Sequence, residues 1–257
     1  MTNRVLKGGI CVGSVHDSLS CGKFKVVDIK SSKNVVVEFL ETGFKVNVQA
    51  VQIRLGTIKD KMSATYYGVG ITGNKYPVSD GKGELTKAYL TWSNMIRRCF
   101  SESYDKRYQT YKDCTCSENF KHYEYFYEWC NKQVGFENKD WHMDKDILIK
   151  GNKIYSEDTC CFVPREINNL LTTRTRFRGE FPIGVHYSTD KKKFVAQISK
   201  NDGQRTHLGL FNTPEEAFYV YKDAKEAYIK EVAEKWKNLI DARVYEALIN
   251  YKIELGD

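Results

Sequence analysis

The sequence predicts an α+β protein built from more than one domain. At 257 residues the chain is longer than one average domain, so two or three compact units are expected. Closely spaced β-branched runs fill the first 57 residues, a strand–turn–strand–helix order follows Trp141, and three strand-like runs precede a helix after Gly184. Strands and helices therefore lie in separate stretches, as they do in α+β proteins.

The stretch 1–57 is expected to form a small β-barrel. KFKVVDI, NVVVEFL and FKVNVQA are rich in β-branched residues and are joined by the turns KSSKN and ETG. Short strands at this spacing suggest a twisted barrel, which resembles the Tudor class of chromatin-binding barrels in architecture. Such a unit either contacts nucleic acid or protein, or has a purely structural role. The glycine-rich stretch 58–85 is expected to be a linker, because no Lys-Ser/Thr pair follows its glycines as a phosphate-binding loop requires.

Helices and two extended pieces are expected between residues 86 and 172. Thr86 caps a predicted helix that runs to about Phe100, and Ser117 caps a second helix rich in aromatic residues. Two extended pieces then flank the turn KGN, and Pro164 opens a short helix. Strand, turn, strand and helix in this order is the plan of a ββα nuclease core.

This middle stretch resembles the HNH endonucleases, and more closely the phage-encoded proteins that join an HNH-like unit to a C-terminal DNA-binding domain. The shared motifs are WSNMIRRCF at 92–100, EYFYEWC at 124–130, MDKDIL at 143–148 and YSEDTCCFVPREINN at 155–169. The resemblance implies descent from a homing-type endonuclease of a phage or mobile element.

The same resemblance assigns five residues to catalytic slots, namely His142, Asp144, Lys145, Asp146 and Asn168. The general base of an HNH enzyme is a histidine directly after the first-strand aspartate, and here Lys145 takes that place. An ordinary lysine is protonated at neutral pH and cannot accept a proton from water. We therefore expect a degenerate HNH-like domain over 86–172. The alternative is an active nuclease in which a bulge re-aims His142 as the base and Mg²⁺ binds Asp144, Asp146 and Asn168.

Zinc is a second possible ligand of the middle stretch, because it contains several cysteines and two histidines. They are Cys114, Cys116, Cys130, Cys160, Cys161, His122 and His142. Their spacings are Cys-x-Cys and Cys-Cys, whereas zinc knuckles use paired Cys-x-x-Cys. We expect buried free thiols; the sequence assigns no cofactor other than Mg²⁺, and that only if the nuclease is active.

The most specific pattern lies at 184–228. GVHYS, KFVAQIS and RTHLGLF read as three antiparallel strands, and Thr213, Pro214 and Glu216 form a strong helix start. A sheet covered on one face by a helix leaves its other face free. Alternation along the second strand places Val195, Gln197 and Ser199 on the free face, and Phe194, Ala196 and Ile198 on the covered face.

The order GV, KFVAQI, HLGLF and TPEEAFYVY resembles the Apetala-type ethylene-response-factor domain, whose strands lie in the DNA major groove. The slots that contact DNA in that family fall on His186, Gln197, Ser199, Arg205 and His207. The family usually has arginines at the slots of His186 and Ser199 and a tryptophan at that of His207, so its target sequence is not transferable. Gln197 could read adenine, and Arg205 could read guanine or bind a phosphate. The alternative is that the two histidines are ordinary solvated surface residues.

Two basic runs accompany the predicted sheet. Lys191, Lys192 and Lys193 crowd its first hairpin turn, and Arg174, Arg176 and Arg178 alternate in TTRTRFRGE just before it. If that arginine run is extended, the three guanidinium groups fall on one side and can follow a phosphate backbone. If it is flexible, it is a solvated linker. We favour the contact with DNA.

The predicted Apetala-type domain spans 173–257 and ends in a helical extension. Its apolar face covers either the preceding domains or a second copy of the chain, and consists of Trp236, Leu239, Ile240, Val244, Ala247 and Leu248. No signal peptide or membrane span is evident, so we expect a cytoplasmic protein of the bacterial host.

The net charge of +7 suits a polyanionic partner. We conclude from the sequence that the chain is a sequence-preferring double-stranded DNA-binding protein that has lost nuclease chemistry. Two alternatives remain open: an active HNH homing-type endonuclease, and a phage factor that binds a host protein. The sequence leaves the target site and the oligomeric state undetermined.

Overall fold

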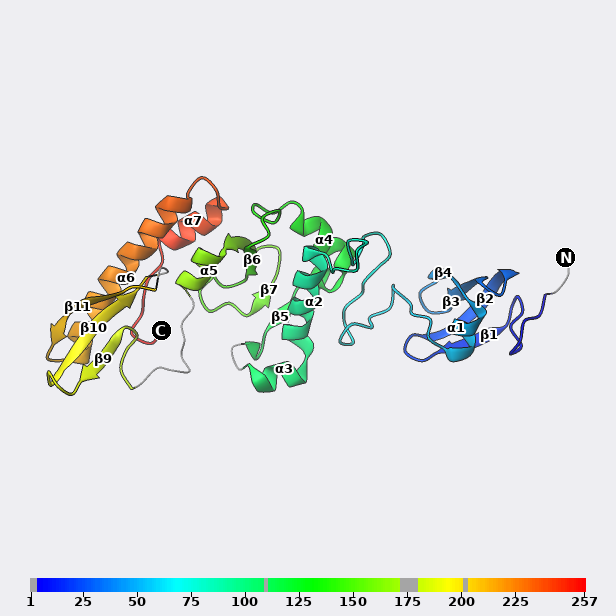
Figure 1. Cartoon of the computed structure of the whole chain (residues 1–257), viewed down its shortest axis with the longest axis horizontal. Coiled ribbons are helices and arrows are strands. Elements are labelled where there is room, and N and C mark those ends of the chain that lie inside the picture. The colour runs from blue at the N-terminus through cyan, green and yellow to red at the C-terminus, as the bar shows by residue number, and fades with distance from the viewer. Residues whose placement is uncertain (1–3, 109–110, 172–179, 201–202) are drawn as a thin grey trace. The chain divides into compact units, whose positions relative to one another are not determined.

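The computed structural model is an α+β fold and describes residues 4–108, 111–171, 180–200 and 203–257. Backbone contacts divide the chain into two compact units, Met1–Trp129 and Cys130–Asp257, which are described separately (Figure 1). The division falls inside the predicted middle domain. The finer boundaries expected after residues 57, 85 and 172 remain a prediction.

The first unit begins with a four-stranded antiparallel sheet in the order β1-β2-β3-β4. Its strands are β1 (Val15–Ser18), β2 (Gly22–Ser31), β3 (Asn34–Phe39) and β4 (Lys45–Val48). Alternate residues of β3 are buried, so one face of the sheet forms a core with Phe24 and Val26 of β2. The three predicted strands are confirmed as β2, β3 and β4, whereas β1 and the short helix α1 (Ala50–Leu55) were not predicted. Closure into a barrel remains a prediction.

The stretch expected to be a linker is held by side chains of the same unit. Among its described residues it forms only isolated bridges, such as Tyr66 with Gly70. Yet the ring of Tyr66 lies 5.3 Å from that of Trp92, and Glu124 accepts hydrogen bonds from the amides of Asn74 and Lys75, each at 2.6 Å. This irregular stretch therefore packs on the helices that follow it.

Those helices are α2 (Lys87–Phe100), α3 (Glu102–Arg107), the 3₁₀ turn η2 (Asn119–Lys121) and α4 (Tyr123–Cys130), with the short strand β5 (Thr115–Cys116) between α3 and η2. The predicted cap is confirmed, because the Thr86 hydroxyl accepts a hydrogen bond from the Tyr89 amide at 3.2 Å. The prediction that Ser117 caps the second helix was wrong, because that helix begins later, at Tyr123; the Ser117 hydroxyl instead accepts a hydrogen bond from the Phe120 amide of η2 at 3.3 Å. The aromatic stripe is core: the side chains of Phe120, Tyr123 and Phe126 are fully buried.

The second unit opens with a strand pair backed by a helix. β6 (Trp141–Asp144) pairs antiparallel with β8 (Cys161–Pro164), and α5 (Arg165–Leu170) follows at once and contacts both strands. The sequence led us to expect the partner of the first strand directly after the turn KGN. That piece is instead the separate two-residue strand β7 (Ile154–Tyr155). The buried apolar run at 161–164 pairs with β6 because it can bury both of its faces.

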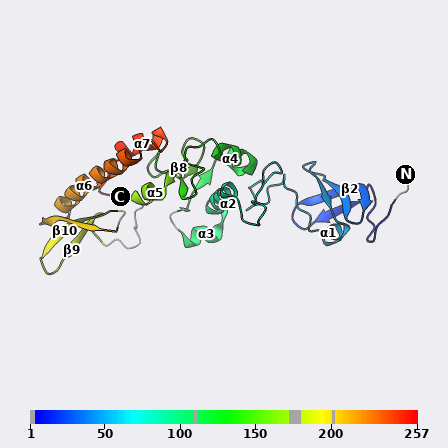
Figure 2. The ribbon, with the colours of Figure 1, turned by 45° about the horizontal axis from the view of Figure 1, so that its top comes forward.

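A three-stranded antiparallel sheet in the order β11-β10-β9 completes the second unit, with helix α6 against it (Figure 2). The strands are β9 (Val185–Ser188), β10 (Lys193–Ser199) and β11 (Arg205–Phe211), and the helix is α6 (Pro214–Trp236). The predicted helix start is confirmed as a capping box: the Thr213 hydroxyl accepts from the Glu216 amide, and the Glu216 carboxylate accepts from the Thr213 amide, both at 3.2 Å.

The C-terminal extension docks within its own unit. The indole of Trp236 donates to the Glu166 carboxylate of α5 at 2.7 Å and lies edge-on to Trp141 at 5.9 Å. Helix α7 (Ala242–Ile249) turns back along α6 and buries Val244 and Leu248. Of the two predicted ways of covering this apolar face, packing inside the chain is therefore observed. No helix among the described residues has the length and apolar character needed to span a bilayer.

Candidate nucleic-acid interface

The strand register brings together the five residues predicted to contact DNA. Gln197 lies opposite His207, Ser199 opposite Arg205, and His186 opposite Val195. Directly opposed residues of antiparallel strands project from the same face. Gln197, Ser199 and Val195 also share a face of β10, because side chains alternate along a strand. All five predicted residues therefore belong to one face of the three-stranded sheet.

A β-bulge makes this arrangement possible. The register shifts between Ala196 and Gln197, so that Leu208 is an extra residue on β11. Without that extra residue, alternation from Leu210 would place Leu208 and Thr206 on the face of Gln197, and would turn His207 away. The bulge thus reverses the alternation of β11 at the position where the predicted contacts begin.

Burial along β10 agrees with the predicted faces only in part, because Phe194 and Gln197, predicted on opposite faces, are both half-buried. Ala196 and Ile198 are buried, whereas Gln197 is half-buried and Ser199 is exposed. Val195 was predicted to point outward, but only 7% of it is exposed. It lies in the central strand between His186 and Leu210, whose side chains flank it on the same face. Its place between two neighbouring strands accounts for the burial of this valine.

The face is basic and lacks carboxylates. Strands β9, β10 and β11 contain no aspartate or glutamate, and His186, Arg205 and His207 are all exposed. Lys191 and Lys192 are exposed in the first hairpin turn, where Lys192 has a positive φ of 50°, and the exposed Lys193 begins β10. The predicted phosphate contacts Arg174, Arg176 and Arg178 lie outside the described residues. The described part of the face therefore offers cationic and neutral hydrogen-bonding groups to a polyanion.

Three of the five residues predicted for the catalytic slots, Asp144, Lys145 and Asp146, are joined by hydrogen bonds where β6 ends. Asp144 ends β6, and its carboxylate accepts hydrogen bonds from the amides of Asp146 and Ile147, both at 2.8 Å. Burial and the neighbouring Asp146 carboxylate raise the pKa of Asp144 to about 7. The next residue, Lys145, is buried, and its ammonium donates to the Asn152 carbonyl at 2.8 Å and to Asp146 at 3.2 Å. The lysine in the base slot is thus a structural residue of this loop.

The remaining slots do not add metal ligands. His142 is exposed on β6 opposite Val163, and Asn168 is half-buried on α5. In the part of the chain that the structure describes, no group of three or more His, Cys, Asp or Glu side chains could hold a metal ion. Two carboxylates next to a buried ammonium are a poor fit for Mg²⁺, because the ammonium repels the cation.

The cysteines are reduced thiols, and four from the middle stretch are buried. Burial raises the pKa of Cys160 to about 12 and that of Cys161 further still. A neutral, buried thiol is unreactive and a poor metal ligand, because both roles require the thiolate. These residues therefore act as small apolar core side chains.

Comparison with known proteins adds no relative: no family model, curated protein or solved structure matches the chain.

Proposed function

We propose that the protein is a sequence-preferring double-stranded DNA-binding protein of phage or mobile-element origin, and that its three-stranded sheet contacts the duplex. The observation that carries the proposal is the register, which unites Gln197 with His207 and Ser199 with Arg205 on one carboxylate-free face. A twisted antiparallel sheet of this width can enter the major groove, where base edges present a distinct pattern for each pair. The net charge of +7 supports a polyanionic partner.

Different residues have different roles in this proposal. The Gln197 amide can donate to and accept from an adenine edge, and the Arg205 guanidinium can donate to guanine or to a phosphate. Lys191 and Lys192 in the hairpin turn, and Lys193 at the start of β10, suit contacts with the DNA backbone, which position the protein without reading sequence. In the family that this stretch resembles, arginines or tryptophan stand at the slots of His186, Ser199 and His207. The target site is therefore expected to be this protein's own.

Loss of nuclease chemistry is the second part of the proposal. It is supported by Lys145, which the resemblance assigns to the base slot and whose ammonium donates hydrogen bonds to the Asn152 carbonyl and to Asp146. We propose that the finer architecture follows the resemblance, with an N-terminal barrel, a degenerate HNH-like domain and an Apetala-type C-terminal domain.

Selection of bound duplexes from a random pool tests the binding function directly. We expect an enriched motif, with affinity that falls steeply as salt rises, because phosphate contacts release counterions. Gln197→Ala should relax preference at one or two base pairs, whereas Lys192→Ala should weaken all duplexes alike. Lys230→Ala, at an exposed lysine of α6, is the matched control and should bind as wild type does. Failure to bind any duplex, or binding that is indifferent to salt, would refute the proposal.

The selected duplex also separates the alternatives. Incubation with Mg²⁺ or Mn²⁺ should leave it intact. Metal-dependent cleavage that is lost in Asp144→Asn would instead establish the active endonuclease. No binding to any duplex, together with saturable binding to one purified host protein, would establish the other alternative, a phage factor that binds a host protein.

A further inference from the structure

A cavity of about 670 Å³ lies beside the sheet in the second unit. The sheet contributes Gln197, Ser199 and Arg205, which belong to the predicted DNA-contacting set. Helix α5 contributes Arg165 and Asn169 to the same cavity. Its volume falls within the roughly 300–1,000 Å³ that is usual for ligand sites. The cavity thus joins part of the predicted readout face to residues that the sequence did not predict.

Positive charge converges on this cavity from four elements. Arg165 comes from α5, Lys200 from the end of β10, Arg205 from β11 and Lys225 from α6. Among the described lining residues there is no aspartate or glutamate. Only Lys200 has an ion pair with a described residue, a long one of 3.9 Å to Glu231. Like charges around one cavity repel one another, so an anion bound there would relieve the repulsion.

Lys225 is the least solvated of these cations. It lies half-buried on α6, with its ammonium 5.8 Å from the centre of the Tyr228 ring. Burial alone lowers the pKa of its amine to about 8, because no carboxylate opposes the desolvation. The amine is still mostly protonated at neutral pH, and a bound anion would stabilise that charge.

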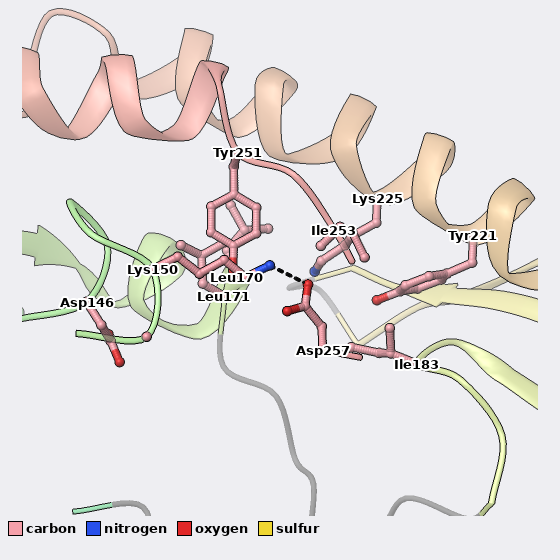
Figure 3. Close-up of a pocket in the computed structure, with 11 residues that line it drawn as sticks. Asp146, Lys150, Leu170, Leu171, Ile183, Tyr221, Lys225, Tyr251, Ile253 and Asp257 are labelled. Atoms are coloured by element: carbon pink, nitrogen blue, oxygen red, sulfur yellow. Dashed lines mark hydrogen bonds and ion pairs between the residues drawn. The ribbon is translucent and has the colours of Figure 1, made fainter. Parts of the chain in front are cut away.

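A neighbouring cavity of about 280 Å³ provides an internal comparison. It shares Leu170, Tyr221 and Lys225 with the larger one, but its lining includes the carboxylates of Asp146 and Asp257. Lys150 pairs with Asp257 there at 2.6 Å (Figure 3). The smaller cavity therefore already contains compensating acids, and the excess of positive charge belongs to the larger one.

The neutral groups of the larger cavity suit a phosphate oxygen. The Asn169 amide and the Ser199 hydroxyl can each donate a hydrogen bond, and the two guanidinium groups can each bind a phosphate in a bidentate manner. We propose that this cavity, between α5, the end of β10 and α6, binds a phosphate group, and that the group is a backbone phosphate of the duplex that contacts the sheet. The inference rests on the proposed function for the source of the phosphate. Its recognition by Arg165, Arg205 and Lys225 does not depend on that function.

Two charge-removing variants test the proposal. Lys225→Met keeps the length and the apolar stem of the side chain, and Arg165→Gln changes an exposed position that should not affect folding. Each should weaken binding of the selected duplex by about tenfold, as expected for loss of a charge-assisted hydrogen bond. Each should also reduce the slope of log affinity against log salt by about 0.9. The matched control is Lys230→Met, an exposed lysine on the same helix, which should change neither quantity.

A second arm uses inorganic pyrophosphate instead of DNA. At matched ionic strength, pyrophosphate should raise the thermal unfolding midpoint of the wild type and should compete with duplex, and both effects should be lost in Lys225→Met and Arg165→Gln. If the pyrophosphate effects are lost but duplex affinity is unchanged, the backbone source is refuted and the cavity binds a free phosphorylated compound.

The outcomes distinguish this inference from the proposed function. The cavity proposal would be overturned, and the proposed function left intact, by three results together. The wild type binds DNA and Lys192→Ala weakens that binding, neither cavity variant alters it, and pyrophosphate has no effect. A wild type that binds no duplex but shows the mutation-sensitive pyrophosphate effect would refute the function and leave the phosphate site. If Lys225→Met does not fold, Arg165→Gln decides the question.

Discussion

Gly184, at the start of the three-stranded sheet, should be among the least replaceable glycines of the second unit. Its φ of 77° lies in the left-handed region, and a Cβ added there would fall inside van der Waals contact of the Tyr221 ring. Its carbonyl also accepts the Gln197 amide at 2.9 Å, so the glycine lies beside the predicted interface. A side chain at this position must either displace the tyrosine or separate α6 from the sheet.

The size of the effect follows from two terms. A left-handed alanine costs about 1–2 kcal/mol, partly offset by about 0.4–1 kcal/mol from the stiffer unfolded chain. Overpacking against a ring adds about 1–3 kcal/mol. Gly184→Ala should therefore lower the free energy of unfolding by about 2–4 kcal/mol.

Gly151 is a matched control for the first term. Its φ is 76°, but a Cβ there would meet no atom within 4 Å. Gly151→Ala should cost only about 0.5–1 kcal/mol, which is the left-handed strain less the gain from the unfolded chain. Urea unfolding followed by tryptophan fluorescence measures both variants. Equal losses would refute the reasoning, because strain alone would then explain both. Tyr221→Ala in the Gly184→Ala background should recover part of the overpacking term.

Two further predictions concern buried charges. Burial opposes ionisation of Glu226, but hydrogen bonds from two lysines and the Ile253 amide lower its pKa from 4.5 to about 2. The ionised carboxylate therefore stabilises the folded protein above pH 4.5, and this contribution disappears as the pH falls toward 2. In urea titrations, Glu226→Gln should lower the free energy of unfolding by about 1–2 kcal/mol at pH 7 and by progressively less below pH 4.5. Glu231→Gln, at an exposed site, is the control and should show the same pH dependence of stability as the wild type. Parallel curves of stability against pH for the wild type and Glu226→Gln would contradict this prediction. Lys145→Met should cost about 1–3 kcal/mol because it leaves the Asn152 carbonyl without its donor, and unchanged urea stability would show that the lysine has no structural role.

The parts of the fold that the sequence predicted best depend on short-range interactions. The start of α6 was predicted correctly because Thr213 and Glu216 exchange hydrogen bonds within one helical turn. The strands of the C-terminal sheet were likewise predicted from alternation and from polar turns between neighbours in the chain. The pairing of β6 was missed because its partner, β8, is separated from it by a long loop that has its own internal hydrogen bonds.

The candidate site likewise depends partly on local sequence and partly on tertiary packing. The sequence by itself determined that the strands of the C-terminal sheet carry basic and neutral polar residues and no carboxylate, since residue types and alternation are local properties. The nuclease-like segment with Lys145 in its base slot stays a prediction from the resemblance. Only the tertiary structure decided that the bulge at Leu208 turns His207 and Arg205 to the face of Gln197 and Ser199, because register depends on which strands meet. It also decided that Arg165 and Lys225, sixty positions apart, line one cavity with that sheet. Convergence of charges from distant elements depends on packing, which no local pattern in the chain encodes.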